Sequence, residues 1–217
     1  MGEPAPTRLV LVRHGESMAT VNQVVGGHEG CTGLSPLGRR QVEALRDRLV
    51  ATGELGEVAA LVASVLPRAV ETAEILAPAL GSPPMRRDCD VCEIHPGEGD
   101  ALPWAEFEAR YPAASPRSRF EPWSPGGESW AEFAARVGRA LNALAHQHGG
   151  TTVVVACHGG VVDASFVAFA NLPIRRNFHL PTENASLTEW ERRPGDDRWW
   201  LRRYNDAAHL QGAFPSA

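Results

Sequence analysis

Three short runs rich in apolar residues stand out along the chain, at residues 8–13, 59–66 and 152–157. None of them alternates regularly between apolar and polar positions, which is typical of strands that are covered on both faces of a parallel sheet. Weaker strand patterns lie at residues 85–93, 185–191 and 198–204, and a Pro-Gly-Asp-Asp turn joins the last two. We therefore expect a sheet whose central strands are buried.

Helical spacing of apolar residues fills the segments between these strands. Ser35 and Pro36 match the N-cap and first position of a helix. Ser129 and Glu132 have the spacing of a capping box and precede a strongly amphipathic segment. Further helices are expected from residue 67, over residues 104–110 and after residue 158. Strands that alternate with helices predict a three-layer α/β/α fold with a mostly parallel central sheet.

The domain organisation follows from length and from one irregular stretch. A chain of 217 residues fits one domain, and we expect residues 1–217 to form it. The alternation of elements breaks down between residues 96 and 125, where six of the 17 prolines lie. Long irregular segments inside compact domains are often functional. We interpret residues 95–126 as an insert that acts as a lid.

Charge and composition narrow the choice of partners. Hydrophobic residues make up 43% of the chain, so a disordered protein is excluded, and the net charge of −5 disfavours nucleic-acid and anionic-membrane binding. Every one of the 21 basic residues is Arg, which excludes a Schiff-base lysine and a P-loop lysine. No transmembrane or signal segment is evident. We expect a cytoplasmic protein with a small-molecule partner, and its oligomeric state stays open, a homodimer included.

The four cysteines suggest no metal centre. Cys89 and Cys92 form a lone C-x-x-C inside the strand expected at residues 85–93. Residues three apart on a strand point to opposite faces, so the two thiols should not meet. No second cysteine pair or H-x3–5-H spacing offers the two further ligands that zinc needs. We expect reduced thiols, with neither metal nor cofactor.

Residues that can bind an anion or act in catalysis follow three of the predicted strands. The first strand leads into Arg13-His14-Gly15, the second leads toward Arg68, and the strand at residues 152–157 leads into His158-Gly159-Gly160. In a parallel sheet, ligands bind beyond the carboxyl ends of the strands. Two guanidinium groups that face one point are tolerated when a dianion lies between them, and phosphate is such an anion. A neutral imidazole at this place can attack phosphorus.

A proton donor is also needed, because the departing alkoxide must be protonated. Glu93 lies at the end of the third predicted strand and is the first candidate. Glu98, in the following Gly-Glu-Gly, is the reserve candidate.

These motifs, in this order, resemble the histidine phosphatase (phosphoglycerate mutase-like) superfamily. The resemblance covers roughly residues 8–165, and it rests on Arg13-His14-Gly15-Glu16-Ser17, Gly33-Leu-Ser-Pro-Leu-Gly-Arg-Arg-Gln41, Ser64-x-x-x-Arg68-Ala-x-x-Thr72-Ala73, Cys92-Glu93-Ile94, Gly127-Glu128-Ser129 and Cys157-His158-Gly159-Gly160.

The resemblance implies a role for each of the matching residues. His14 would be the phosphorylated nucleophile and Glu93 the proton donor. The phosphate would be bound by Arg13, Arg68, His158 and the Gly159 backbone. Thr20 stands where many members carry an Asn that contacts phosphate, so it joins the candidate phosphate-binding residues.

Three functions fit this set. The leading hypothesis is a metal-independent phosphatase that hydrolyses a small phosphomonoester through a phosphohistidine. The second is a phosphoglycerate-type phosphomutase, which needs a closed, cation-rich cover; the 96–125 segment has three arginines and no lysine. The third is a non-catalytic phosphate-sensing domain, which would have no need for a nucleophilic imidazole.

Overall fold

One six-stranded sheet organises the molecule, and the computed structural model describes residues 5–112 and 118–211. The strand order is β3-β2-β4-β1-β5-β6. The strands are β1 (Thr7–Arg13), β2 (Val58–Ala63), β3 (Met85–Arg87), β4 (Thr152–Cys157), β5 (Leu187–Arg192) and β6 (Trp199–Asp206). The pairings from β3 to β1 are parallel and those of β5 are antiparallel, which confirms the predicted α/β class with a mostly parallel sheet.

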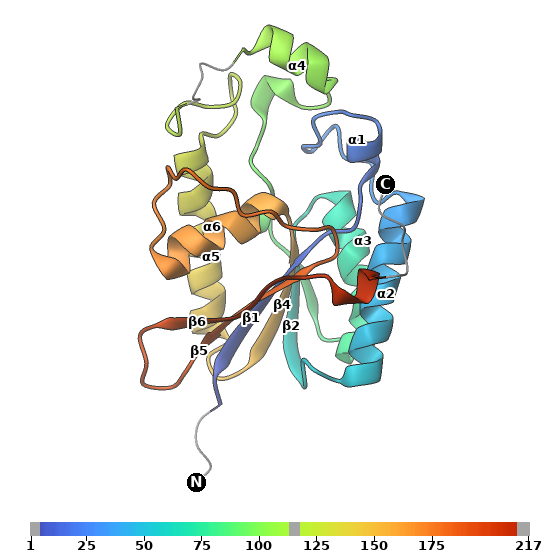
Figure 1. Ribbon diagram of the computed structural model, residues 1–217, viewed down its shortest axis with the longest axis vertical. Coiled ribbons are helices and arrows are strands. Elements are labelled where there is room, and N and C mark those ends of the chain that lie inside the picture. The colour runs from blue at the N-terminus through green and yellow to red at the C-terminus, as the bar shows by residue number, and fades with distance from the viewer. Residues whose placement is uncertain (1–4, 113–117, 212–217) are drawn as a thin grey trace.

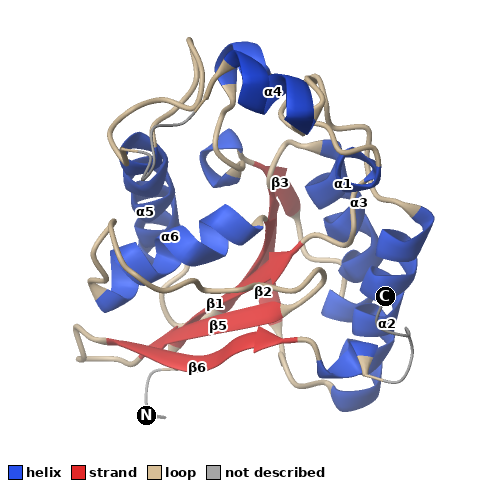
Figure 2. Cartoon of the chain, turned by 45° about the horizontal axis from the view of Figure 1, so that its top comes forward, coloured by secondary structure: helices blue, strands red, loops and turns tan. Residues whose placement is uncertain are grey.

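Helices cover both faces of this sheet (Figures 1 and 2). One face carries α5 (Trp130–Gln147) and α6 (Gly159–Ala170), and the other carries α2 (Pro36–Thr52) and α3 (Pro67–Leu76). Two short helices, α1 (Met18–Val21) and α4 (Trp104–Arg110), lie beyond the carboxyl ends of the parallel strands. Within the described residues, no helix is both long and apolar enough to cross a membrane.

Alternation of side chains along the central strands feeds two hydrophobic cores. In β1, Leu9 and Leu11 pack toward α5 and α6, while Val10 and Val12 pack toward α2 and α3. All four are fully buried. A strand with both faces covered needs apolar residues at every position. This is the physical reason for the uninterrupted apolar run that predicted the strand.

The third strand is shorter than the sequence predicted. Only Met85–Arg87 pairs with β2, and a 3₁₀ turn follows at Cys89–Val91. The Asp88 side chain accepts a hydrogen bond from the Asp90 N–H at 2.9 Å and starts this turn. Local side-chain capping of this kind competes with strand pairing. The prediction of a strand over residues 85–93 was therefore wrong beyond residue 87.

The segment 95–126 lies over the carboxyl end of the sheet, with α4 at the top of Figure 1. It is joined to the loop after α1, because the Val25 N–H donates to the Leu102 carbonyl at 2.8 Å and the Trp104 N–H donates to the Gln23 carbonyl at 2.9 Å. Residues 113–117 of this segment lie outside the described residues. That residues 1–217 form a single domain, and that residues 95–126 act as its lid, remain predictions.

Candidate active site

Two histidines meet at the carboxyl ends of adjacent parallel strands. Because Arg13 in β1 pairs with Cys157 in β4, the residues that follow them, His14 and His158, lie side by side. Their ring centroids are 5.1 Å apart in a T-shaped arrangement. Both rings are buried. The sheet register thus brings together two imidazoles that are 144 residues apart in sequence.

The hydrogen bonds of His14 determine where its proton lies. Its Nδ1 is 2.6 Å from the Gly15 carbonyl, which can only accept, and its Nε2 is 3.0 Å from Nε of Arg68, which can only donate. His14 is therefore the Nδ1–H tautomer with the lone pair on Nε2. Burial, together with the charges of Arg68 and Arg13, lowers the pKa of His14 well below its ordinary value. A neutral imidazole is a nucleophile at neutral pH, and here its Nε2 lone pair is occupied by the Arg68 hydrogen bond until a substrate takes that donor.

Two arginines converge on His14, and among the described residues neither forms an ion pair with a carboxylate. Arg68 begins helix α3, is 5% exposed, and donates from Nη1 to the Gly26 carbonyl at 2.6 Å. Arg13 donates to the Thr182 carbonyl, while its buried Nε has no partner in the part of the chain that the structure describes. Burial lowers the pKa of Arg13, the charges of Glu93 and Glu183 raise it, and the charge of Arg68 lowers it. The two guanidinium groups thus place positive charge directly beside His14.

His158 is held from behind by Ser64. Its Nε2 lies 2.7 Å from Ser64 Oγ, and the hydroxyl donates onward to the Cys92 sulfur at 3.1 Å, so the ring donates to Ser64. Its buried Nδ1 has no partner among residues 5–112 and 118–211. Burial and then the charges of Arg68, His14 and Arg13 lower the pKa of His158 well below 6.5. An anion in the site would reverse this electrostatic effect and favour an imidazolium.

Glu93 lines the same cavity as His14, and its carboxylate accepts hydrogen bonds from two backbone amides. Its Oε2 accepts from the Gly160 N–H at 3.0 Å and its Oε1 accepts from the Ile94 N–H at 3.1 Å. A Cβ on Gly160 would lie only 2.1 Å from Glu93 Oε1, so only glycine leaves this carboxylate its place. Glu98 is exposed, accepts from the Tyr111 hydroxyl at 3.1 Å, and does not line the cavity.

The remaining two candidates also line the cavity. Gly159 lies at the first turn of α6 beside Arg13, since a Cβ there would be 3.6 Å from the Arg13 Nε. Thr20 is exposed, and its hydroxyl lies 3.0 Å from the hydroxyl of Ser17. Of the sequence-predicted residues, the structure places Arg13, His14, Thr20, Arg68, Glu93 and Gly159 on the wall of one cavity and His158 directly behind it.

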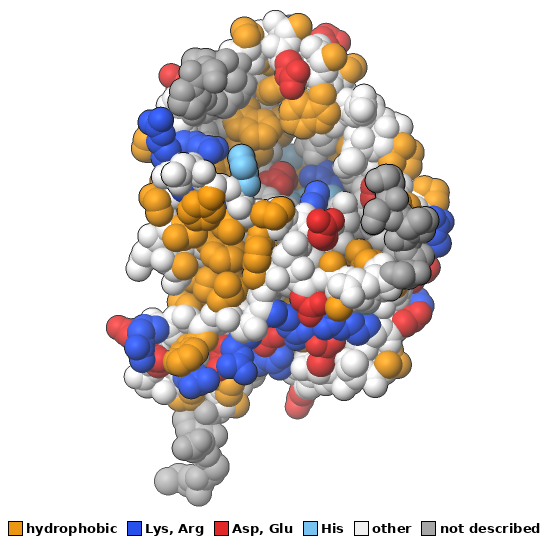
Figure 3. Space-filling model, viewed as in Figure 1, with side chains coloured by type: hydrophobic (Ala, Val, Ile, Leu, Met, Phe, Trp, Pro, Cys, Tyr) orange, Lys and Arg blue, Asp and Glu red, His pale blue; other side chains and the backbone are white. Residues whose placement is uncertain are grey.

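That cavity has a volume of about 760 Å³, and it is lined by both charged and apolar side chains. Figure 3 shows a hollow in the upper half of this face, with charged and histidine side chains deep inside and hydrophobic side chains above them. The cavity is lined by Trp104, Trp123 and Trp130, and also by Asp163 and Thr182. Sequence reasoning missed these five residues. Trp130 both packs against the hydrophobic core and lines the cavity.

The prediction for the two neighbouring thiols was wrong. Because the chain turns at Cys89–Val91 instead of extending as a strand, the sulfurs of Cys89 and Cys92 lie within 4.8 Å of each other. The prediction assumed a strand, in which these side chains would point apart. Both thiols are free of disulfides.

Taken together, the geometry suits an oxyanion. Two guanidinium groups and two imidazoles surround one point, each cation lowers the pKa of the imidazoles, and two buried nitrogen atoms have no partner among the described residues. A phosphate dianion would accept hydrogen bonds from the guanidinium groups and, once His158 is protonated, from its Nδ1, and it would neutralise their charge. His14 would then be in position to attack phosphorus.

Comparison with known proteins agrees with this geometry. A metal-independent phosphoserine phosphatase from Arabidopsis thaliana is 30% identical over 214 residues, which cover 96% of this chain and 85% of that protein. A glucosyl-3-phosphoglycerate phosphatase from Mycobacterium tuberculosis is 33% identical over 222 residues, covering 94% and 96%. These names support the phosphatase that the sequence predicted.

The solved structure of a phosphatase also matches this chain. The mycobacterial glucosyl-3-phosphoglycerate phosphatase in complex with VO3 matches with a TM-score of 0.72 and 30% identity, over 91% of this chain and 98% of that chain. The family model described as the histidine phosphatase superfamily (branch 1) matches residues 9–207. The chain belongs to the histidine phosphatase superfamily.

Proposed function

We propose that this protein is a phosphatase that hydrolyses a small phosphomonoester through a phosphohistidine on His14. The observation that carries the proposal is the lone pair on His14 Nε2, buried beside two arginines and facing a cavity that also contains Glu93. The phosphatase names of relatives that are 30% and 33% identical support it. A cytoplasmic location and a small-molecule partner, without nucleic acid or membrane, belong to the same proposal.

In the first step, the Arg68 Nε–H moves its hydrogen bond from His14 Nε2 to a phosphate oxygen, which releases the lone pair. Nε2 of His14 then attacks phosphorus, and the bond to the ester oxygen breaks. Glu93, in its protonated form, gives its proton to the departing oxygen, so that a neutral alcohol leaves. Negative charge spreads over the equatorial oxygens, where Arg13, Arg68 and an imidazolium at His158 stabilise it. The Nδ1–H bond from His14 to the Gly15 carbonyl keeps the ring oriented throughout.

In the second step, water attacks the phosphohistidine and the P–N bond breaks. The carboxylate of Glu93 accepts the proton of that water, and the electron pair returns to Nε2 of His14. Inorganic phosphate leaves with both residues back in their starting states. The step requires no group besides these side chains and water.

The shape of the cavity favours an alcohol larger than serine. Three tryptophans form an apolar wall above the charged floor, and about 760 Å³ is far more than one phosphate occupies. Tryptophan rings provide a large, flat apolar surface with an N–H donor at the edge, which suits a sugar or another ring. We therefore infer a phosphomonoester with a bulky, ring-containing alcohol part, similar in size to the substrate named for the mycobacterial relative.

The decisive experiment separates the three functions. Wild-type protein, without added divalent metal, should release phosphate from p-nitrophenyl phosphate, and rapid acid-free quenching should trap a phosphoenzyme. His14→Ala should abolish both, whereas His146→Ala, at the exposed end of α5, should not change either. A faster interconversion of phosphoglycerates than phosphate release would overturn the proposal in favour of a mutase. Binding of phosphoesters without any turnover would favour a sensing domain.

A further inference from the structure

A second cluster of reactive side chains lies next to the proposed phosphate site. His28, Cys89, Cys92 and His95 each contribute one ligand atom, and these four atoms all lie within 4.8 Å of one another. They come from two separate segments, the loop after α1 and the turn after β3. Neither the proposed reaction nor the fold explains why two thiols and two imidazoles should meet there.

The spacing of these atoms is that of a tetrahedral metal site. Nε2 of His28 lies 3.7 Å from the Cys89 sulfur, and Nε2 of His95 lies 3.6 Å from the same atom. A zinc ion with Zn–S bonds of about 2.3 Å and Zn–N bonds of about 2.0–2.1 Å holds sulfur and nitrogen ligands about 3.6 Å apart. The side chains therefore already stand close to the distances that a shared metal ion requires.

His95 also has the outer partner that a metal-binding histidine usually has. While its Nε2 faces the Cys89 sulfur, its Nδ1 lies 3.5 Å from a carboxylate oxygen of Glu128. The same oxygen accepts the His95 backbone N–H at 3.0 Å. A carboxylate on the far nitrogen keeps the proton there and leaves Nε2 free to bind metal.

Arg136 holds the turn that carries the cysteines. Its guanidinium donates to the carbonyls of Cys89 and Cys92 at 3.1 and 3.3 Å, and it binds both oxygens of Glu128 at 2.7 and 2.6 Å. These contacts come from helix α5 and do not involve the four ligand atoms. The ligand arrangement is thus supported by the core of the protein.

We propose that His28, Cys89, Cys92 and His95 bind one structural Zn²⁺ ion. Two thiolates and two imidazoles are a donor set that zinc prefers. The two thiolate charges balance the ion, and Glu128 balances Arg136, so the cluster is neutral as a whole. All four positions of a tetrahedron are filled by protein, which leaves no open position for substrate and makes the site structural.

Such an ion would fix both sides of the proposed active site. His28 lies two residues after Gly26, whose carbonyl accepts from Arg68, and Glu93 lies between the ligands Cys92 and His95. Cys92 also accepts the Ser64 hydroxyl hydrogen bond, and Ser64 contacts His158. The metal would therefore position the proton donor and one phosphate-binding arginine without taking part in the chemical step.

A Cys89–Cys92 disulfide explains less of the arrangement. Two sulfurs alone would suffice for it, whereas here two imidazole nitrogens also approach the same sulfur atom. The Glu128 carboxylate beside His95 Nδ1 likewise suits a metal-bound imidazole, and the hydrogen bond that the Ser64 hydroxyl donates to the Cys92 sulfur suits a thiolate.

Metal content provides the test. Protein purified under reducing conditions from zinc-containing medium should carry about one zinc per chain by elemental mass spectrometry. After removal of zinc by a chelator, Co²⁺ should give the intense visible absorption of tetrahedral thiolate coordination. Glu128→Gln should weaken Co²⁺ binding about 10–100-fold. Cys89→Ser and His28→Asn should lose the metal.

The controls make each result decisive. Cys31→Ser changes a buried thiol in the same apolar cluster but outside the ligand set, and it should retain full metal content. His28 is exposed, so His28→Asn should keep the fold, which circular dichroism checks. A folded wild type with neither zinc nor the Co²⁺ band, equal metal loss in Cys31→Ser, or a zinc-free Cys89–Cys92 disulfide would overturn the proposal. These measurements do not depend on phosphatase activity.

Discussion

The Nε–H of Arg68 donates a hydrogen bond to the Nε2 atom of His14 over 3.0 Å. This contact places a permanent positive charge against the lone pair that we propose as the nucleophile. The charge of Arg68, added to burial, lowers the pKa of His14 well below 6.5. The imidazole therefore stays neutral in mildly acidic solution, where an ordinary histidine would be protonated.

The pH dependence of kcat/KM should reveal this contact. Protonation would remove the lone pair of His14, and a lowered pKa moves that protonation to lower pH. We expect kcat/KM for p-nitrophenyl phosphate to stay nearly constant as pH falls from 7 to 6. Arg68→Ala should shift the acidic limb toward higher pH, because one cause of the low pKa is removed.

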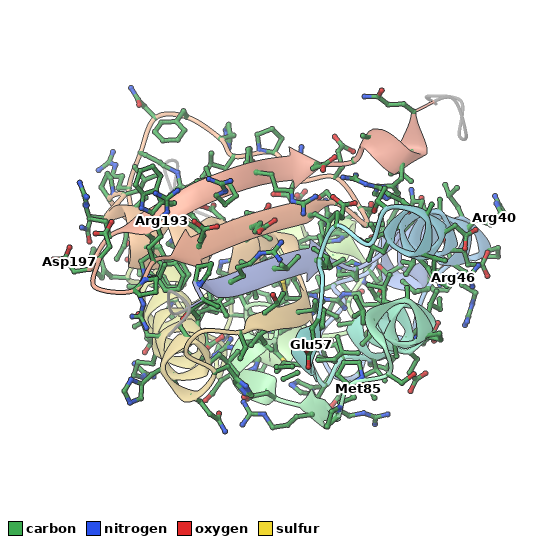
Figure 4. All side chains as sticks on the ribbon, turned by 90° about the horizontal axis from the view of Figure 1, so that it is seen from below. Arg40, Arg46, Glu57, Met85, Arg193 and Asp197 are labelled. Atoms are coloured by element: carbon green, nitrogen blue, oxygen red, sulfur yellow. The ribbon has the colours of Figure 1, made fainter. Side chains whose placement is uncertain are left out.

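The same variant should weaken binding of vanadate, measured by inhibition, by about tenfold to a hundredfold, since a charge-assisted hydrogen bond contributes about 1.5–3 kcal/mol. Arg40 is the matched control, because it is exposed and lies on the outer side of α2, as Figure 4 shows. If Arg68→Ala and Arg40→Ala bind vanadate equally well, Arg68 has no role in the phosphate site.

Stability should also fall as the solution becomes acidic. Burial lowers the pKa of both His14 and His158, so below pH 6.5 the unfolded chain binds protons that the native protein does not. Each such histidine makes unfolding easier by about 1.4 kcal/mol for every pH unit below 6.5. Urea unfolding at pH 7.5, 6.5 and 5.5 should show this loss.

Substitution of one histidine tests the assignment. His14→Gln should reduce the pH slope of the unfolding free energy by about 1.4 kcal/mol per pH unit between pH 6 and 5. His146→Gln on the exposed end of α5 should leave the slope as in the wild type. Equal slopes in all three proteins would contradict the buried neutral state of His14.

Most of the fold could be predicted from local sequence patterns, and the errors of that prediction have local causes. The apolar runs predicted β1 and β4 almost to the residue, because a strand buried on both faces leaves no polar positions. Helix α4 was predicted at its observed bounds, residues 104–110. The third strand was predicted too long, since the Asp88 side chain accepts a hydrogen bond from the Asp90 backbone N–H and so favours a turn over strand pairing, a competition that the apolar pattern does not reveal.

The candidate site was predictable only where motifs directly follow buried strands. His14 and His158 carry that signal because each is followed by glycine at a strand end. Trp104 and Trp123 carry no such signal, since their position over the site depends on how the irregular segment folds back. The four clustered histidines and cysteines come from segments about 60 residues apart, so the usual ligand spacing never appears in the sequence.

The aromatic wall leads to a prediction about substrate size. Trp104 lines the cavity and is 38% exposed, so its removal leaves a larger opening without removing a core side chain. Trp104→Ala should raise KM for a phosphomonoester with the proposed ring-containing alcohol part about tenfold and leave kcat nearly unchanged, because the ring contributes binding that substrate and transition state share.

Steady-state kinetics on two substrates check this. Phosphoserine, which is too short to fill the upper cavity, should show a change in KM of less than about threefold. Trp200→Ala, an exposed tryptophan of β6 away from the cavity, is the control. Equal effects of Trp104→Ala on both substrates would contradict the inferred position of the alcohol part.

Gly160 offers the sharpest test of the proton donor. A Cβ there would lie 2.1 Å from Glu93 Oε1 and 3.1 Å from the Phe133 ring, so Gly160→Ala must displace the carboxylate. A displaced acid matters most when the leaving alkoxide is basic. We expect kcat for an alkyl phosphate to fall about 10²-fold, and kcat for p-nitrophenyl phosphate to fall less than about tenfold.

The difference between the kcat losses for the two substrates separates loss of the proton donor from a general disturbance of the active site. Gly138→Ala in α5 is the matched control, since its Cβ would make an ordinary 3.5 Å contact with Ala168 and both rates should stay at the wild-type level. Glu93→Gln should reproduce the leaving-group dependence of Gly160→Ala. If Gly160→Ala slows both substrates equally while Glu93→Gln does not, the glycine serves packing alone and Glu93 is not positioned through it.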